Sequence, residues 1–205
     1  MARPSKPKLS TTAIADAALT LVDAHGEFTL PQLAKALSVT ASSLYNHVEG
    51  KAEIIELMRG RAMSEIQLPD LDRVDWQEAV RQIAMEYWAS YAKHPRLIPL
   101  FTSHTVRDQT TLRVYDALAE AFAVAGFEPK ERLQAITIID SFVLGSALDA
   151  TAPRAVWEAD TQSSHAFTEA LAAGLQEPNR AEQTFFHGLT FILRGLTGKQ
   201  KKADS

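Results

Sequence analysis

Apolar residues recur at steps of three and four along almost the whole chain. That spacing places them on one face of a helix, and no stretch shows the period-two alternation, rich in β-branched residues, of a strand. Glycines and prolines divide the pattern: Gly26 and Gly126 follow apolar runs, Gly50 precedes one, and Pro69 begins the clearest linker. The sequence therefore predicts an all-α fold.

The expected helices are short in the first third of the chain and longer after it. Ser10, Thr29 and Thr40 each precede an apolar run and are suitable N-caps. The helices are expected at about residues 11–25, 30–37, 41–47, 51–68, 75–93, 95–103, 107–125, 129–150, 165–175 and 178–196. Residues 151–164 hold no clean period and are expected to form a loop.

Composition excludes several classes of protein. The 205 residues include no cysteine, which excludes disulfides, thiolate catalysis and cysteine-ligated metal sites. The 46% of hydrophobic residues are enough for a core, yet no run approaches the roughly 18 apolar residues of a membrane span. The basic first eight residues lead into no apolar signal core. We therefore expect a cytoplasmic protein with no membrane partner.

The charge is distributed unevenly along the chain. A net charge of −4 argues against nucleic acid as a partner when the chain is taken whole. Residues 1–51, however, hold five Lys and Arg against four Asp and Glu, which is +1, so the remainder carries −5. The slightly basic N-terminal part gives weak support to a nucleic-acid contact there.

Residues 28–51 have the pattern of a helix-turn-helix, two short helices joined by a three-residue turn. Leu33, Leu37, Val39 and Leu44 would form its small core, with Ala34 where the helices cross. Polar groups suited to base edges and phosphates fall on the outer face of the second helix, namely Ser42, Ser43, Tyr45, Asn46 and His47. Spacing alone is equally compatible with an ordinary helical hairpin that has a polar solvent face.

This segment resembles the tetracycline-repressor (TetR) family of bacterial transcriptional regulators. The residues that carry the resemblance are Leu33-Ala34, Leu37-Ser38-Val39, Ser43-Leu44-Tyr45-Asn46-His47-Val48 and Lys51. Weaker similarity to the tetracycline repressors themselves lies in Trp76-Gln77, Gly126-Phe127, Leu144-Gly145 and Leu148-Asp149. The resemblance implies an N-terminal three-helix helix-turn-helix domain and a larger C-terminal helical domain for ligand binding and dimerisation.

The implied organisation has five parts. They are a basic disordered arm at 1–9, a DNA-binding domain at 10–50, a connecting helix at 51–68, a ligand-binding and dimerisation domain at 69–198 and a polar tail at 199–205. The implied partners are a palindromic double-stranded DNA operator, a small organic effector and a second copy of the chain. The implied activity is repression that the effector relieves.

Roles in DNA binding follow from the resemblance position by position. Tyr45, His47 and Lys51 match positions that contact backbone phosphates, and Ser42 and Ser43 match positions that face the major groove. Thr40 would cap the second helix and touch a phosphate, and the arm would hold further phosphates. The expected DNA-binding residues are Thr40, Ser42, Ser43, Tyr45, Asn46, His47, Lys51, Arg3, Lys6 and Lys8.

Two residues depart from the family pattern in the helix-turn-helix. Ser38 stands where the turn usually has glycine, and a left-handed conformation there would cost about 1 kcal/mol. Pro31 stands where the tetracycline subgroup has a base-reading arginine, so the tetracycline operator sequence is not implied.

The C-terminal helices are expected to form the dimer and the effector pocket. Two helix-turn-helix units must reach successive major grooves about 34–36 Å apart, which favours a homodimer through helices at about 131–150 and 179–197. The pocket candidates are Ile83, Tyr87, Phe101, His104, Tyr115, Leu118, Phe122 and Phe142. Thr102 and Ile83 replace a metal-binding histidine and a drug-binding asparagine of the tetracycline subgroup. The expected ligand is therefore organic and largely apolar, without metal or cofactor.

Two other classes of function remain as alternatives. An enzyme is disfavoured because no Gly-rich phosphate loop, H-E-x-x-H, G-x-S-x-G or paired Glu-x-x-His occurs. Asp140 and Asp149 are carboxylates of one expected helix, but nine residues separate them, so they share no face. The other alternative is a helical adaptor or ligand-binding protein without DNA binding, against which Tyr45, His47 and Lys51 argue.

Overall fold

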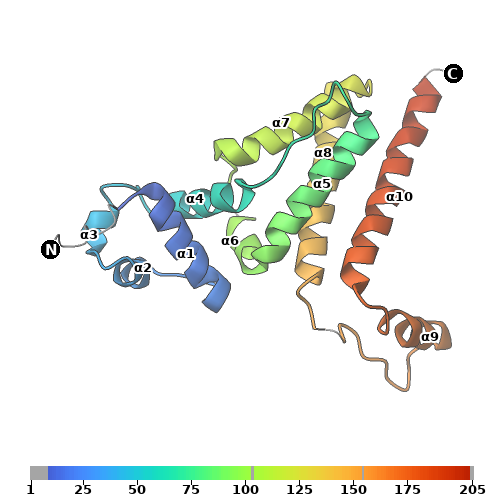
Figure 1. The fold of residues 1–205 in the computed structure, drawn as a ribbon. Coiled ribbons are helices and arrows are strands. Elements are labelled where there is room, and N and C mark those ends of the chain that lie inside the picture. Colours follow the sequence, from blue (N-terminus) through green and yellow to red (C-terminus); the bar gives the residue numbers. More distant parts are fainter. Residues whose placement is uncertain (1–8, 103, 154, 204–205) are drawn as a thin grey trace. The chain divides into compact units, whose positions relative to one another are not determined.

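The structure is a computed structural model that describes residues 9–102, 104–153 and 155–203. Every regular element in these ranges is helical, which confirms the predicted all-α fold (Figure 1). The elements are α1 (Thr11–His25), α2 (Leu30–Ala36), α3 (Ala41–Leu44), α4 (Lys51–Met63), α5 (Trp76–Lys93), the 3-10 helix η1 (Pro95–Leu97), α6 (Ile98–Phe101), α7 (Gln109–Val124), α8 (Pro129–Asp149), α9 (His165–Gly174) and α10 (Arg180–Ala203).

Three helices end three or more residues away from their expected ends. The helix expected at 41–47 ends at Leu44, and residues 45–47 form turns. The helix expected to reach residue 68 ends at Met63, and the hydroxyl of Ser64 directly after it donates to the carbonyl of Arg61 at 2.8 Å. The last helix continues to Ala203, past its expected end near Leu196 and into the expected polar tail. The apolar period of the sequence does not mark these ends.

The chain divides into two compact units. The first contains the residues up to Leu68 together with Lys93–Ala117, and the second contains Pro69–Ala92 and the residues from Leu118 onward. The break after Leu68 coincides with the expected linker, but residues 93–117 group with the N-terminal part instead of the C-terminal one. Two helices, α5 and α7, each contribute residues to both units.

The first unit is built around the contact between α1 and α4. Ile14, Val22, Ile54 and Met58 are fully buried, and these two helices form the most extensive contact between elements. At the edge of this contact, Arg61 Nε donates to Asp16 Oδ1 at 2.6 Å. That hydrogen bond, together with the negative charge of Asp16, raises the pKa of Arg61 above its usual value. The connecting helix and the first helix therefore share one core.

The second unit has an aromatic interior. Trp88 stacks on Phe185 at a centroid distance of 4.9 Å, and Phe185 stacks on Phe142 at 5.5 Å, with interplanar angles of 14° and 11°. A Cβ on Gly188 would lie 2.6 Å from the Phe142 ring, so this glycine lets α8 and α10 approach closely. The stack joins α5, α8 and α10 in one packed layer. Elsewhere in this unit, α9 has no buried residue.

Candidate functional site

The helix-turn-helix is formed by α2 and α3, and local caps define both helices. Thr29 and Gln32 form a capping box at the start of α2, and Thr40 Oγ1 accepts from the backbone N–H of Ser43 at 3.2 Å at the start of α3. Both are the caps that the sequence predicts. Ser38 in the turn adopts a φ of 56°, which confirms the left-handed conformation expected there.

A small apolar core sets the orientation of α3. Leu33 and Leu44 are fully buried and Ala34 is nearly so, as expected for the crossing of two short helices. Leu37 and Val39, which the sequence also predicts in this core, are only half-buried.

The opposite surface carries exposed Ser42, Asn46 and His47, with Tyr45 56% exposed. Ser42 belongs to α3, whereas Tyr45, Asn46 and His47 lie in the turn that follows it and not on the helix where the sequence predicts them. A surface of short polar groups and one aromatic hydroxyl is chemically suited to base edges and phosphates.

The three hydroxyl groups at the start of α3 bond to one another. Thr40 Oγ1 lies 2.9 Å from Ser42 Oγ and 2.8 Å from Ser43 Oγ, in addition to the backbone bond from Ser43. Ser42 is exposed and Ser43 is half-buried. Ser43 therefore supports the cap of the helix, whereas Ser42 is the more accessible of the two expected groove-facing serines.

Lys51 begins α4 directly after Gly50, whose lack of a side chain leaves this helix start without a side-chain cap. The Lys51 ammonium lies 5.1 Å from the centroid of the Phe28 ring, which orients the long side chain by a cation–π contact. An ammonium beside uncapped N–H groups at the start of a 13-residue helix is a suitable environment for a phosphate. The expected arm residues Arg3, Lys6 and Lys8 lie outside the described residues.

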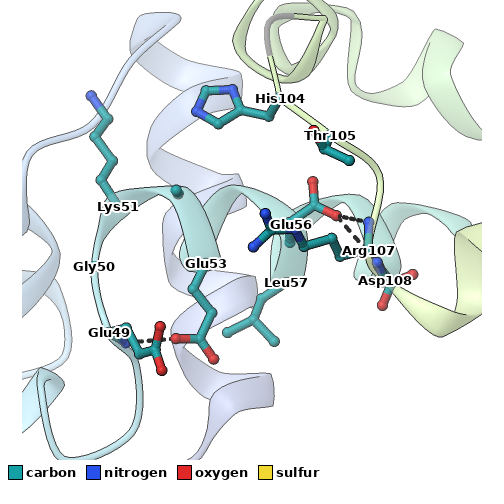
Figure 2. Close-up of a pocket in the computed structure, with 11 residues that line it drawn as sticks. Glu49, Gly50, Lys51, Glu53, Glu56, Leu57, His104, Thr105, Arg107 and Asp108 are labelled. Atoms are coloured by element: carbon teal, nitrogen blue, oxygen red, sulfur yellow. Dashed lines mark hydrogen bonds between the residues drawn. The ribbon is translucent and has the colours of Figure 1, made fainter.

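A cavity of about 780 Å³ adjoins this helix start within the first unit. It is lined by residues of α4 and by the segment that precedes α7, namely Glu49, Gly50, Lys51, Ala52, Glu53, Glu56, Leu57, His104, Thr105, Arg107 and Asp108 (Figure 2). The Glu53 carboxylate accepts from the backbone N–H of Glu49 at 2.6 Å, and that of Glu56 accepts from the backbone of Arg107 at 2.7 Å. Two of the acidic groups in the lining therefore have structural partners.

The expected pocket residues are divided between the two units. Ile83, Tyr87, Leu118, Phe122 and Phe142 belong to the second unit, and Phe101, His104 and Tyr115 belong to the first. Most of them are buried, including Ile83, Tyr87 and Phe122, whereas Phe142, His104 and Tyr115 are half-buried. Phe122 packs against Trp76 and Phe127 at centroid distances of 6.1 and 5.2 Å, which is a core contact within its unit.

Two polar groups near the candidate residues were not predicted as sites. Tyr87 donates its hydroxyl to Asp140 Oδ1 at 2.5 Å, so a carboxylate lies beside a fully buried aromatic side chain of the second unit. In the first unit Arg59 is only 3% exposed and its guanidinium covers the Phe101 ring at 4.5 Å. The sequence signals Arg59 only as a charged residue between Met58 and Ala62 in an apolar stripe.

Comparison with known proteins assigns the chain to a family. Residues 68–199 match the family model described as "Tetracyclin repressor-like, C-terminal domain". The chain belongs to the TetR family of transcriptional regulators. The resemblance seen in residues 28–51 lies in the first unit, and the family match includes most of the second unit.

Curated TetR-family relatives include the repressor DrrR1 of Streptomyces coeruleorubidus, which is 30% identical over 151 residues. That match covers 71% of this chain and 56% of DrrR1, so it spans little more than half of the relative's length. The tetracycline repressor of class D from Escherichia coli is 24% identical over 197 residues, which is 92% of this chain and 89% of the repressor.

Solved TetR-family structures share the fold. Apo ActR of Streptomyces coelicolor matches with a TM-score of 0.80 at 20% identity, covering 95% of this chain and 98% of ActR. The regulator SCO7222 of the same organism matches with a TM-score of 0.73 at 26% identity, over 93% and 98% of the two chains. ActR has also been solved in complex with actinorhodin.

Two absences hold for the part of this TetR-family chain that the structure describes. None of the helices in that part of the chain is long and apolar enough to cross a membrane. Within the same residues, no group of three or more His, Asp or Glu side chains is placed to hold a metal ion.

Proposed function

We propose that the chain is a homodimeric repressor that binds a palindromic DNA operator through α3 and is released by a small organic effector. The observation that carries the proposal is the exposed polar surface of α3 and the turn after it, presented by a capped helix-turn-helix in a chain of the TetR family. Tyr45, His47 and Lys51 are its phosphate contacts, and Ser42 faces the groove. The arm residues Arg3, Lys6 and Lys8 add phosphate contacts.

The homodimer is supported by the apolar surface of the second unit. Leu133 and Phe191 are each 67% exposed and Ile138 is 47% exposed, although large apolar residues are ordinarily buried. A groove of about 610 Å³ lies along α8 and is also lined by Leu196 of α10. Leu133 and Ile138 are among the α8 residues that line it. Exposed apolar residues of this size are typical of a protein interface. Pairing of α8 and α10 with their symmetry mates would cover it.

The effector is proposed to be an organic molecule with aromatic character. The second unit contains the stacked rings of Trp88, Phe185 and Phe142 and the hydroxyl–carboxylate pair of Tyr87 and Asp140. Aromatic side chains with few polar groups are the residue types that usually line a small-molecule site. ActR binds actinorhodin, so this compound is a suitable first probe for release of the DNA.

The DNA-binding proposal is tested with duplexes selected from a library whose random core spans about two helical turns, roughly 20 base pairs. Selection is expected to recover a palindrome, and Tyr45→Ala and Lys51→Ala should each weaken binding. Lys51→Ala should also lower the slope of log affinity against log salt by about 0.9 for the one lost phosphate contact. Fluorescence anisotropy at several salt concentrations measures both effects.

The matched control is Lys93→Ala. Lys93 is an exposed lysine that lies 3.5 Å from Glu65, and its removal changes the net charge by the same amount. It should leave the salt slope unchanged. Equal slopes for the Lys51→Ala variant and the unmodified protein would exclude Lys51 as a phosphate contact, and failure to enrich any duplex would overturn the DNA-binding function.

A further inference from the structure

The hydroxyl groups at the start of α3 already bond to one another. Thr40 Oγ1 lies 2.9 Å from Ser42 Oγ and 2.8 Å from Ser43 Oγ, and it also accepts from the backbone N–H of Ser43. A hydroxyl is both donor and acceptor, so it bonds to several different base edges. These three residues therefore contribute little to the choice between bases. A group that distinguishes one base from another must lie elsewhere on this surface.

A side-chain amide distinguishes adenine from the other bases in the major groove. Its NH2 group donates to adenine N7 while its carbonyl accepts from the N6 amino group, so both ends of the amide must be free. Residues 28–51 contain two such side chains, Gln32 and Asn46. Gln32 Oε1 accepts from the backbone N–H of Thr29 at 2.9 Å and from its hydroxyl at 2.8 Å. Gln32 could therefore bind a base only by giving up its part in the cap of α2.

Asn46 is the amide that remains available. Its side chain is exposed and makes no hydrogen bond to the part of the chain that the structure describes. The backbone around it is held in place, because the N–H groups of His47 and Val48 donate to the Leu44 carbonyl at 2.9 and 3.0 Å. Leu44 and Val48 are also buried, so the core holds the turn on both sides of Asn46. A free amide on a fixed backbone loses little conformational freedom when it binds.

Asn46 lies on the same surface as Ser42, which is expected to face the groove. Tyr45 has right-handed helical backbone angles, with φ −66° and ψ −11°, so the chain keeps its helical direction directly after α3. Ser42, Tyr45 and Asn46 are spaced i, i+3 and i+4 and therefore share one face. The exposed residues at the start of α3, Ala41 and Ser42, are small. This surface therefore allows α3 to approach the base edges closely enough for the short Asn46 side chain to reach them.

We propose that Asn46 recognises one adenine in each half of the operator, with its NH2 group donating to N7 and its carbonyl accepting from the N6 amino group. The proposal rests on the DNA-binding function proposed above and adds to it a residue that selects a base. Tyr45, His47 and Lys51 contact phosphates in that function, which positions the protein on the duplex but carries no sequence information. Removing the Asn46 amide should therefore change which duplexes bind, whereas removing a phosphate contact should weaken all of them.

Base analogues in the selected duplex test this contact at the level of single atoms. Each adenine of one half-site is replaced in turn by 7-deazaadenine, which still pairs with thymine but has a C–H group in place of the N7 acceptor. One replacement should weaken binding of the unmodified protein by about fivefold, the lower end of what a bidentate pair contributes. The same replacement should change the affinity of Asn46→Ala by less than about twofold, because this variant has no amide that loses a partner. Fluorescence anisotropy measures both affinities.

Asn46→Asp tests the same contact through a change of preference. The carboxylate keeps the shape of the amide but has no N–H to donate to adenine N7, and an aspartate accepts instead from the amino group of cytosine. Selection with this variant should therefore recover cytosine in place of the adenine, with the other positions of the palindrome unchanged. The matched control is Asn179→Asp in the second unit, which changes the net charge by the same amount. It should still select adenine.

The outcomes separate the role of Asn46 from the function on which it rests. If the selection enriches no duplex for the unmodified protein, the DNA-binding proposal is wrong. If a palindrome is enriched but no replacement by 7-deazaadenine weakens its binding, or if Asn46→Ala is as sensitive to the replacement as the unmodified protein, Asn46 does not recognise adenine and DNA binding stands. An equal loss of affinity for all duplexes in Asn46→Ala, or selection of adenine by Asn46→Asp, would lead to the same conclusion.

Discussion

The helix-turn-helix buries its large apolar residues, whereas the long helices α8 and α10 leave several of theirs exposed. In the helix-turn-helix, Phe28, Leu33 and Leu44 are completely buried in a core made by short helices. On α8 and α10, Leu133 and Phe191 are both 67% exposed. The first region therefore buries its apolar side chains within its own core. The second leaves apolar side chains exposed, and we propose that a second copy of the chain covers them. The following predictions test this difference, from the largest expected effect to the smallest.

The largest effect is expected for Leu44→Ala. Leu44 is fully buried in a very small core, and truncation of a buried leucine costs about 2–5 kcal/mol. We expect the helix-turn-helix to unfold before the rest of the chain and binding of the duplex to be lost, as followed by thermal unfolding and anisotropy. Leu148→Ala is the control, because Leu148 on α8 is 41% exposed. Unchanged stability of Leu44→Ala would show that the helix-turn-helix does not depend on its own core.

The next effect concerns the exposed apolar surface. Phe191→Glu should raise the dimer dissociation constant by about 30-fold or more, which corresponds to the roughly 2 kcal/mol of a strong interface contact. Sedimentation equilibrium measures this change. Val124→Glu introduces the same charge at an apolar residue of α7 that is 74% exposed, and it should leave the association unchanged. A monomeric unmodified protein at micromolar concentration would remove the basis for the dimer.

A smaller loss of stability is expected for Tyr87→Phe in the second unit. The variant removes the 2.5 Å hydrogen bond to Asp140, and a hydrogen bond to a charged group contributes about 1.5–3 kcal/mol. Urea unfolding should show a loss near the lower end of that range, because Asp140 is only half-buried. Asp140→Asn keeps a carbonyl acceptor and should cost less. If the two variants were equally unstable, the whole contribution of the hydrogen bond would depend on the charge of Asp140, and the carbonyl of asparagine would not replace it.

The smallest effect is a gain in stability. Ser38→Gly should stabilise the helix-turn-helix by about 1 kcal/mol, because glycine adopts the observed φ of 56° without the strain of a side chain. Asn179→Gly is the matched control, since Asn179 has a φ of 60° and asparagine tolerates this conformation better than serine. Differential scanning calorimetry should therefore show a larger increase for Ser38→Gly. An increase only for Asn179→Gly would contradict this account of the turn.

Local signals in the sequence were sufficient for the helix-turn-helix. The caps at Ser10, Thr29 and Thr40 and the left-handed residues Gly26 and Ser38 are all where the sequence predicts them. Each depends on contacts within about one helical turn, so residue type and spacing are enough to predict it. The exposed face of α3 follows from the buried position of Leu44. The roles of these residues in DNA binding stay a prediction.

Contacts between distant residues were not accessible in the same way. Arg59 reaches the Phe101 carbonyl across 42 residues, and Tyr87 reaches Asp140 across 53. From helical periodicity, Arg59 is only one polar residue of an amphipathic helix and Asp140 is only a carboxylate on a helix face. Periodicity does not predict the distant partner of either residue. It also cannot tell that α9 buries none of its residues, since its sequence is no less apolar than that of a packed helix.

The sequence by itself determined the all-helical fold, the capped helix-turn-helix and the polar surface of α3, because these depend on helical period and on side-chain to backbone bonds of short range. Only the tertiary structure decided that residues 93–117 belong with the N-terminal unit, that Arg59 is buried against the end of α6 while Glu56 contacts the start of α7, and that α8 and α10 keep apolar residues exposed. Burial is a property of which helices meet, and the free energy that determines this is summed over contacts between residues far apart in the chain.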